Sequence, residues 1–193
     1  MVTSRALYLA FLLAIGAERL FEVALSRRNA ARAFARGGRE SGQAHFPAMV
    51  ALHTAFLASC ALESGIRTFP GALGWAAVAA AMGAQALRYW AVASLGDRWN
   101  VRVIVVPGEP PVQSGPYRFM RHPNYTAVIL ELAALPLAGG AWLTALVAGG
   151  VNALVLRRRL AVEERELMRD PEWRAHFAAL PRFWPRLGSA TRT

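Results

Sequence analysis

The sequence predicts an all-α protein, a polytopic membrane bundle of about five transmembrane helices. The first observation is composition: 55% of the 193 residues are hydrophobic and 18% are charged, whereas soluble domains contain roughly 45–50% apolar and about 25% charged residues. The second is that charged segments, or Gly and Pro residues, divide the apolar residues into five runs. The third is that arginines gather in alternate segments between those runs, as expected for a chain that crosses a membrane repeatedly.

The five apolar runs are the expected transmembrane helices. They cover residues 6–25, 47–62, 71–95, 124–138 and 141–156. A spanning helix needs about 17–25 residues, so the two short final runs, which Gly139 and Gly140 separate, are expected to form a tight helical hairpin. The first run has an alternative interpretation as a signal peptide with a cleavage-like site at residues 14–16. Its apolar pattern continues past that site to Leu25, as in an uncleaved helix.

The arginines also predict the orientation of the chain. Three segments that would lie on the same side of the membrane carry many of them. These arginines are Arg27, Arg28, Arg32, Arg36, Arg39, Arg98, Arg102, Arg118, Arg121, Arg157, Arg158 and Arg159. Segments on the other side contain only Arg5 and Arg67, so the positive-inside rule places the N-terminus outside and the C-terminus in the cytoplasm. The net charge of +10 is then mainly a topology signal with some attraction to membrane lipids, and no nucleic-acid partner is expected.

Several chemically notable residues lie inside the apolar runs. Cys60 is the single cysteine, which excludes a disulfide framework and a cysteine-based zinc site within the chain. We interpret Cys60 as a packing residue and His53 as a packed or hydrogen-bonded residue, and no metal site is predicted. Glu131 is an acid within a predicted span, where acids are costly and often functional. It is expected either to face a pocket or to pair with an arginine such as Arg88.

A second group of charges lies near the inner end of the first run. Glu18, Arg19 and Glu22 are expected to form an internal ion-pair cluster, because unpaired charges are costly inside a membrane.

A polar and aromatic segment, residues 114–125, leads directly into the fourth run. Pro123 suits the first turn of a helix, which would place His122 at the helix entrance beside free backbone N–H groups that favour an anionic ligand group. The alternative is a plain helix start at the lipid headgroup level, where Tyr and Arg side chains are common anchors. The residues alone do not separate these two interpretations.

A charged segment, residues 157–166, follows the fifth run. If the helix continues beyond the membrane, Arg159 and Glu163 lie four residues apart and share a face. The adjacent acids Glu163 and Glu164 would then hold the ammonium and ribose hydroxyls of a cationic nucleotide cofactor in a pocket at the membrane surface. The alternative is a solvated, charged helix end.

These segments together resemble the isoprenylcysteine carboxyl methyltransferase family. The likeness rests on residues 115–117, residues 121–125, and Arg159 with the pair Glu163-Glu164. The resemblance implies a membrane helix bundle that binds S-adenosylmethionine at its cytoplasmic face, with a cofactor pocket of six residues. Those residues are Tyr117, His122, Pro123, Tyr125, Glu163 and Glu164.

The same resemblance implies a catalytic set. It consists of Arg159, Arg121 and Glu164, with the two arginines helping to hold the acceptor anion. Ala127 occupies a position where the family often has Gly, so the added methyl group bears on how closely the cofactor can approach there. The catalytic base stays unassigned.

The N-terminal half resembles a bacterial branch of the family, through residues 18–22, 26–29, 87–90 and 99–108. This branch is found beside type III polyketide synthases and methylates hydroxyl groups of long-chain alkylpyrones and alkylresorcinols. The resemblance therefore implies an inner-membrane O-methyltransferase with a lipophilic acceptor, either a long-chain phenol or enol or a lipid-linked carboxylate. Two alternatives stay open: a non-catalytic membrane scaffold or transporter subunit, and a related membrane reductase.

The whole chain is expected to be one membrane-embedded methyltransferase domain. Three N-terminal helices would occupy residues 1–95, the catalytic region residues 96–170 and a tail residues 171–193. The tail is expected to pack along the membrane surface through its aromatic residues. These are Trp173, Phe177, Phe183 and Trp184, near the prolines Pro181 and Pro185. Whether the tail docks on the site, and the oligomeric state, are left open.

Overall fold

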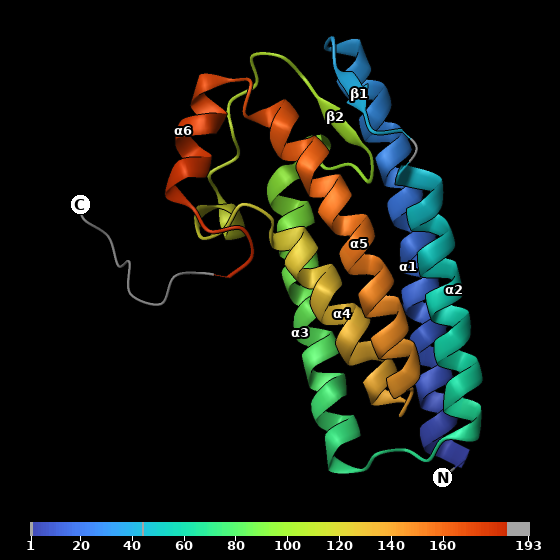
Figure 1. The fold of residues 1–193 in the computed structure, drawn as a ribbon. Coiled ribbons are helices and arrows are strands. Elements are labelled where there is room, and N and C mark those ends of the chain that lie inside the picture. The colour runs from blue at the N-terminus through green and yellow to red at the C-terminus, as the bar shows by residue number, and fades with distance from the viewer. Residues whose placement is uncertain (1, 44, 185–193) are drawn as a thin grey trace.

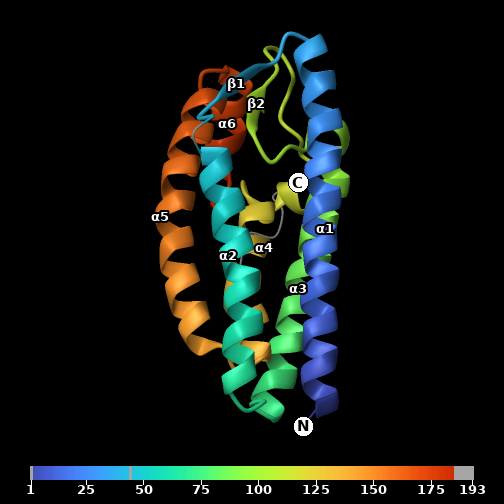
Figure 2. The same cartoon turned by 90° about the vertical axis from the view of Figure 1, so that its right-hand side faces the viewer.

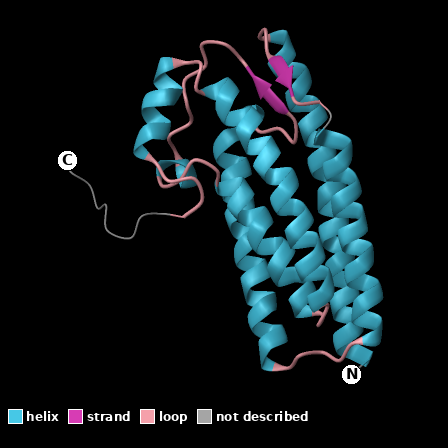
Figure 3. Cartoon of the chain, in the orientation of Figure 1, coloured by secondary structure: helices cyan, strands magenta, loops and turns pink. Residues whose placement is uncertain are grey.

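The protein is mostly helical in a computed structural model that describes residues 2–43 and 45–184. Its six described α-helices are α1 (Val2–Ala35), α2 (His45–Ile66), α3 (Ala72–Leu95), α4 (Pro123–Ala138), α5 (Trp142–Leu167) and α6 (Pro171–Ala179). Two short strands, β1 (Arg39–Ser41) and β2 (Val103–Val105), pair antiparallel with Ser41 opposite Val103. The predicted all-α class is confirmed, because this small sheet is the only strand pairing among the described residues (Figure 3).

Helices α1 to α5 run side by side as an elongated bundle (Figure 1). One end of the bundle carries a cap made of the two strands, α6 and the irregular segments around them, and the N-terminus lies at the other end (Figures 1 and 2). Two 3₁₀ turns belong to the cap, Gly96–Arg98 after α3 and Gly115–Arg118 before α4. The cap therefore gathers the segments that the arginine pattern placed on one side of the membrane.

The predicted helical hairpin between the two short runs is present. Helix α4 has 16 residues, which corresponds to about 24 Å at a rise of about 1.5 Å per residue. The turn closes through Gly140, whose φ of 76° favours glycine. Gly139 packs against the ring of Tyr8, where an added Cβ would lie only 2.3 Å from Cε1 of Tyr8. Glycine is therefore required at this turn for both its backbone freedom and its lack of a side chain.

A cluster of buried and partly buried polar side chains, the mid-bundle ion cluster, joins α1, α3 and α4. It consists of Glu18, Arg19, Glu22, Gln85, Arg88 and Glu131. Arg88 donates from Nε and Nη2 to the two carboxylate oxygens of Glu22, each over 2.6 Å. Arg19 lies 3.3 Å from Glu131, and Arg88 lies 4.0 Å from it. The internal pairing predicted for the first run is confirmed, and Glu131 pairs with arginines.

The apolar core confirms the prediction for Cys60. Its side chain is fully buried in a cluster with Tyr8, Leu12, Phe56 and Leu135. Cys60 therefore acts as a small packing residue, as buried free cysteines commonly do.

Many large apolar side chains lie on the outside of the bundle. They include Leu7, Leu13, Leu20, Phe21, Leu62, Ile66, Leu73, Trp75, Met82, Leu146, Val147 and Leu154. By length and apolar composition, one helix among the described residues is suited to cross a membrane, Phe46–Ile66 within α2. Helix α4 is short, and α1 contains the charges of the ion cluster. Five spans therefore stay a prediction.

Candidate active site

The two segments singled out in the sequence meet in the cap, where α4 begins and α5 leaves the bundle. Pro123 is the first residue of α4 and His122 precedes it, which confirms the predicted helix start. Helix α5 continues to Leu167, so Arg159 and Glu163 share a helix face as expected. Both residues approach the start of α4 and border a cavity there.

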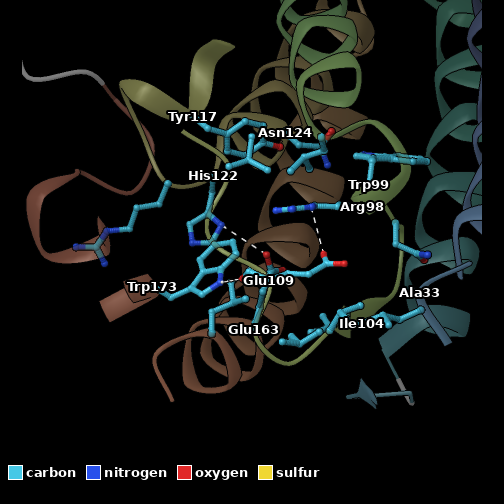
Figure 4. A pocket seen from close by; sticks show the side chains of 18 of the residues that line it. Ala33, Arg98, Trp99, Ile104, Glu109, Tyr117, His122, Asn124, Glu163 and Trp173 are labelled. Carbon is cyan, nitrogen blue, oxygen red and sulfur yellow. Dashed lines mark hydrogen bonds and ion pairs between the residues drawn. The ribbon is translucent and has the colours of Figure 1, made fainter. Parts of the chain in front are cut away.

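This cavity, here called the polar cavity, has a volume of ≈ 160 Å³ (Figure 4). Charged and aromatic side chains from both ends of the chain line it. Among them are Arg36, Arg98, Trp99, Glu109, Tyr117, Arg121, His122, Asn124, Tyr125, Arg159, Glu163, Trp173 and Phe177. Aromatic faces favour cations, and the arginines and glutamates of the lining can pair with charged groups of either sign. The lining therefore suits a polar ligand that carries both positive and negative groups.

One wall of the polar cavity is a hydrogen-bonded group, the junction network, made of Tyr125, Arg159 and Glu163. The Tyr125 hydroxyl donates to the Glu163 carboxylate and accepts a hydrogen bond of 2.6 Å from Nε of Arg159. The Arg159 guanidinium also lies over the Tyr125 ring, 5.4 Å from its centre. Nη1 of Arg159 contacts the sulfur of Met49 at 3.3 Å. Tyr125 thus links the acid to the guanidinium and fixes both.

His122 connects this wall to Glu164. Its ring stacks on Tyr125 with centres 5.3 Å apart, and Nε2 lies 3.1 Å from Oε1 of Glu164. Nδ1 lies 3.9 Å from Oε1 of Glu163 (Figure 4). His122 is buried, so these neighbours hold its ring in one orientation.

Glu164 is turned away from the polar cavity, which it does not line. Arg182 donates to both of its carboxylate oxygens, at 3.0 and 2.7 Å, and Arg121 lies 3.7 Å away. Burial alone would raise the pKa of Glu164, but the hydrogen bonds from His122 and Arg182 outweigh it and lower the pKa to about 2. Glu164 therefore remains ionised and anchors its cationic neighbours.

The tail docks onto the site, a point that the sequence left open. The backbone N–H groups of Arg121 and His122 donate to the carbonyls of Pro181 and Arg182, at 2.9 and 3.0 Å. Phe183 packs against the cluster that contains Tyr125, and Phe177 is buried. Trp184 is exposed, and Pro185 lies outside the described residues. The aromatic residues Phe177 and Phe183 thus complete the site.

The Glu109 loop, residues 106–114 between β2 and the 3₁₀ turn at Gly115, closes the outer side of the polar cavity. Glu109 was not among the site residues predicted from the sequence. Glu109 forms an ion pair with Arg36 at 3.0 Å. It forms a second with Arg98 at 3.2 Å (Figure 4). The indole N–H of Trp173 donates to the Glu109 carbonyl over 3.0 Å. The loop is therefore tied to the end of α1 through Arg36, to the turn after α3 through Arg98, and to α6 through Trp173. Glu109 stands between Gly108 and Pro110, a turn signal that carries no hint of its partners.

A second cavity, the apolar cavity, lies between α1, α2, α4 and α5 and opens to the outside of the bundle, since its wall includes the exposed side chains of Leu13 and Leu20. Its volume is ≈ 850 Å³. Aliphatic side chains form most of its wall, including Leu9, Leu12, Leu13, Leu20, Val50, Leu57, Val128, Val155 and Leu156. Four residues line both cavities: Trp99, Asn124, Tyr125 and Arg159. The two cavities therefore meet at this junction.

The predicted site residues are only partly brought together. Those that line the polar cavity are Tyr117, Arg121, His122, Tyr125, Arg159 and Glu163. Pro123 starts α4 without lining the polar cavity, and Glu164 supports the site from behind. The buried side chain of Ala127 borders neither of the two cavities. The departure from Gly at this position therefore concerns helix packing.

Comparison with known proteins adds a family to this geometry. The profile of the isoprenylcysteine carboxyl methyltransferase (ICMT) family matches residues 77–169, which include both segments of the site. The uncharacterized protein YpbQ of Bacillus subtilis is 36% identical over 151 residues, covering 78% of this chain and 90% of the relative. An uncharacterized protein of Haemophilus influenzae is 27% identical over 148 residues, 76% of this chain and 86% of the relative. No solved structure matches the chain significantly.

Proposed function

Because the chain belongs to the isoprenylcysteine carboxyl methyltransferase family, a family of membrane methyltransferases, we propose that it methylates an oxygen atom of a lipophilic acceptor with S-adenosylmethionine. The observation that carries this proposal is the junction of two chemically different cavities. A charged, aromatic cavity in the cap meets a large apolar cavity in the bundle at Trp99, Asn124, Tyr125 and Arg159. This arrangement suits a reaction between a polar cofactor and a lipophilic substrate.

The residues of the polar cavity fit the chemistry of the cofactor. Glu163 would hold its ammonium group or ribose hydroxyls, while Tyr117 and Trp173 offer aromatic faces. Arginines of the same cavity would pair with its carboxylate. When bound, S-adenosylmethionine would supply a methyl group that is already activated on a positively charged sulfur.

The polar cavity is smaller than a typical small-molecule pocket of about 300–1,000 Å³. The Glu109 loop covers it through ion pairs with Arg36 and Arg98. We therefore expect this loop to shift outward when a nucleoside enters.

The apolar cavity would receive the alkyl chain of the acceptor, with the reacting oxygen at the junction. Arg159 would stabilise negative charge on that oxygen, because its guanidinium lies at the boundary and is held by Tyr125. The bond from oxygen to the methyl carbon forms as the carbon–sulfur bond breaks, and a hydroxyl acceptor also loses its proton. Positioning of the two partners and exclusion of water would supply much of the rate. The acceptor is a long-chain phenol or enol, such as an alkylresorcinol or alkylpyrone, or a lipid-linked carboxylate.

We further propose that the protein is embedded in a bacterial inner membrane with its cap in the cytoplasm. The cap contains the arginine-rich segments that the positive-inside rule assigns to that side. The apolar side chains exposed on the outside of the bundle are suited to contact lipid tails. The cofactor would then enter from the cytoplasm and the acceptor from the bilayer.

The first test is calorimetric titration of S-adenosylmethionine into detergent-purified protein. We expect binding in the micromolar range that Glu163→Ala weakens at least tenfold. Glu166→Ala is the matched control, because Glu166 lies on the same helix but pairs with Arg169 away from both cavities. Binding that is equal in the two variants would remove Glu163 from the cofactor site. No binding by folded wild-type protein would refute the methyltransferase proposal and favour a non-catalytic membrane scaffold.

A further inference from the structure

We infer that Arg182, which lines neither cavity, is a positioning residue of the proposed cofactor site. It acts through Glu164, which fixes the ring of His122 in the wall of the polar cavity. Because it concerns the cofactor, this role rests on the methyltransferase function proposed above. Arg182 belongs to the segment that follows α6, residues 180–184, here called the strap, which lies against the start of α4.

The backbone of the strap is held in place independently of the Arg182 side chain. The carbonyls of residues 180–183 accept hydrogen bonds of 2.7–3.0 Å from Arg121, His122 and Thr126. The backbone N–H groups of Arg121 and His122, which precede α4, are therefore taken up by the strap. A change in the Arg182 side chain leaves all of these bonds in place, so its effects can be assigned to the guanidinium.

The Arg182 side chain reaches from the strap to Glu164. Its Nε and Nη2 donate to the two carboxylate oxygens, at 3.0 and 2.7 Å. The partners differ in exposure, since the side chain of Arg182 is 58% exposed and that of Glu164 is 7% exposed. A bidentate pair fixes the plane of a carboxylate as well as its position. Arg182 therefore determines where Oε1 of Glu164 lies.

Glu164 in turn determines which edge of the His122 ring faces which way. Aromatic neighbours hold the plane of this ring: Tyr125 stacks on it with centres 5.3 Å apart, and Phe177 meets it edge-on at 5.8 Å. Packing alone distinguishes the ring from its flipped orientation poorly, because the two have nearly the same shape. The hydrogen bond of 3.1 Å between Nε2 and Oε1 of Glu164 does distinguish them.

The same hydrogen bond fixes the tautomer of the neutral His122 ring. An ionised carboxylate only accepts hydrogen bonds, so Nε2 carries the hydrogen and Nδ1 keeps its lone pair. Nδ1 lies 3.9 Å from Oε1 of Glu163, and both residues line the polar cavity (Figure 4). A hydrogen-bond acceptor is thus held beside the acid proposed to bind the cofactor. Without the pull of Glu164, the ring would also present an N–H or a carbon edge at this place.

A second arginine of the C-terminal segment provides the matched control. Arg174, on α6, donates from Nε and Nη2 to the carbonyl of Met168, at 3.2 and 3.1 Å. It lines neither cavity, and its hydrogen bonds serve the turn between α5 and α6. Arg174→Gln therefore removes an arginine and its hydrogen bonds without touching Glu164.

The first measurement uses detergent-purified protein without cofactor. Heteronuclear NMR of the histidine rings, at a pH where His122 is neutral, should show one tautomer with its hydrogen on Nε2. The signal is assigned by its loss in His122→Gln. Arg182→Gln should give a mixture of the two tautomers, while Arg182→Lys, which keeps the charge but not the bidentate fork, should lie between. Arg174→Gln should leave the wild-type tautomer unchanged.

Calorimetric titration of S-adenosylmethionine then measures the consequence for binding. Arg182→Gln should weaken binding about tenfold, because a misplaced ring loses a hydrogen bond to a charged group, and Arg182→Lys should recover part of that loss. In a Glu164→Gln background, Arg182→Gln should add less than about twofold, as expected for residues that act through one another. Thermal unfolding checks that each variant is folded, and Arg182→Lys keeps the test available if Arg182→Gln is not.

Three results would overturn the positioning role of Arg182. They are a His122 tautomer that is the same in wild type and Arg182→Gln, cofactor binding that Arg182→Gln leaves unchanged, and a loss of binding that adds fully to that of Glu164→Gln. Because the NMR measurement needs no cofactor, its outcome is separate from that of the methyltransferase proposal. A tautomer that depends on Arg182 in a protein without S-adenosylmethionine binding would support the positioning of the ring and refute the methyl transfer.

Discussion

The mid-bundle ion cluster and the junction network both lie largely inside the protein and both contain arginine and glutamate, yet their internal bonding differs. In the ion cluster, Arg88 and Glu22 form a bidentate ion pair. Arg19 pairs with two further acids, Glu18 and Glu131. The cluster joins α1, α3 and α4. In the junction network, a neutral tyrosine stands between acid and guanidinium. The ion cluster borders the apolar cavity through Arg19, Glu22 and Arg88, whereas the junction network borders both cavities.

The difference indicates how charge is used in each place. Direct ion pairs between helices contribute to specifying how three helices pack, and removing one member leaves an uncompensated buried charge. The junction network stands where the two cavities meet, so its atoms are within reach of both proposed ligands and its replacement is expected to affect binding and rate more than folding. The same residue types therefore lead to opposite expectations for mutants.

The largest effect is expected for Arg88→Leu. The change leaves Glu22 buried without its bidentate hydrogen bonds from Arg88. Breaking a buried ion pair in this way costs about 3–5 kcal/mol of unfolding free energy. Denaturant unfolding of the protein in detergent measures it. The double variant Arg88→Leu with Glu22→Leu should recover part of the loss. A loss below about 1 kcal/mol in the single variant would show that the cluster does not stabilise the bundle.

Tyr125→Phe should reduce activity more than stability, the opposite of Arg88→Leu. It removes the hydroxyl that joins Arg159 to Glu163 but keeps the ring that stacks on His122. We expect kcat/KM for methyl transfer to fall about 100-fold, which corresponds to about 2.7 kcal/mol of transition-state stabilisation. The unfolding free energy should change by less than that of Arg88→Leu. Tyr89→Phe is the control, since Tyr89 is exposed on α3. Near-normal kcat/KM in Tyr125→Phe would contradict a catalytic role for the junction network.

A smaller effect is expected at the loop over the polar cavity. Glu109→Gln weakens the ion pairs with Arg36 and Arg98, so the loop should open more often. The association rate of S-adenosylmethionine should rise by roughly two- to fivefold, in line with the modest energies of partly exposed ion pairs. Stopped-flow tryptophan fluorescence can follow this rate, because Trp99 and Trp173 line the cavity. Glu172→Gln, on α6, is the control. An unchanged or slower rate would indicate that the loop does not limit entry.

The smallest effect is a pH dependence at Glu164. Its pKa is lowered to about 2 in the folded protein from an ordinary value of 4.5, so the ionised carboxylate contributes stability that is fully present above about pH 4.5. That contribution decreases as the pH falls from 4.5 towards 2. The difference in unfolding free energy between wild type and Glu164→Gln should therefore narrow between pH 6 and pH 3. If that difference in unfolding free energy stays constant across this range, ionisation of Glu164 does not contribute to the pH dependence of stability.

Residue order by itself was enough to locate the five long helices and much of the site chemistry, but it did not predict the two strands or α6. Apolar run lengths predicted α1 to α5, and the Gly139-Gly140 break predicted the hairpin, because both depend on local composition and backbone freedom. Pro123 marked the start of α4, and the spacing of Arg159 and Glu163 placed them on one helix face. The family was also evident from short ordered motifs, which the match to residues 77–169 confirms.

Only the tertiary structure decided which of these groups meet. Glu163 and Glu164 are neighbours in sequence, yet one lines the polar cavity and the other pairs with Arg182. This happens because adjacent helix residues point about 100° apart. The partners of Glu109 come from the turn after α1 and from the turn after α3. The apolar cavity exists because four helices leave space between aliphatic side chains whose sequence pattern is that of an ordinary core. Contacts between distant segments depend on how helices pack, and no local pattern in the sequence records that packing.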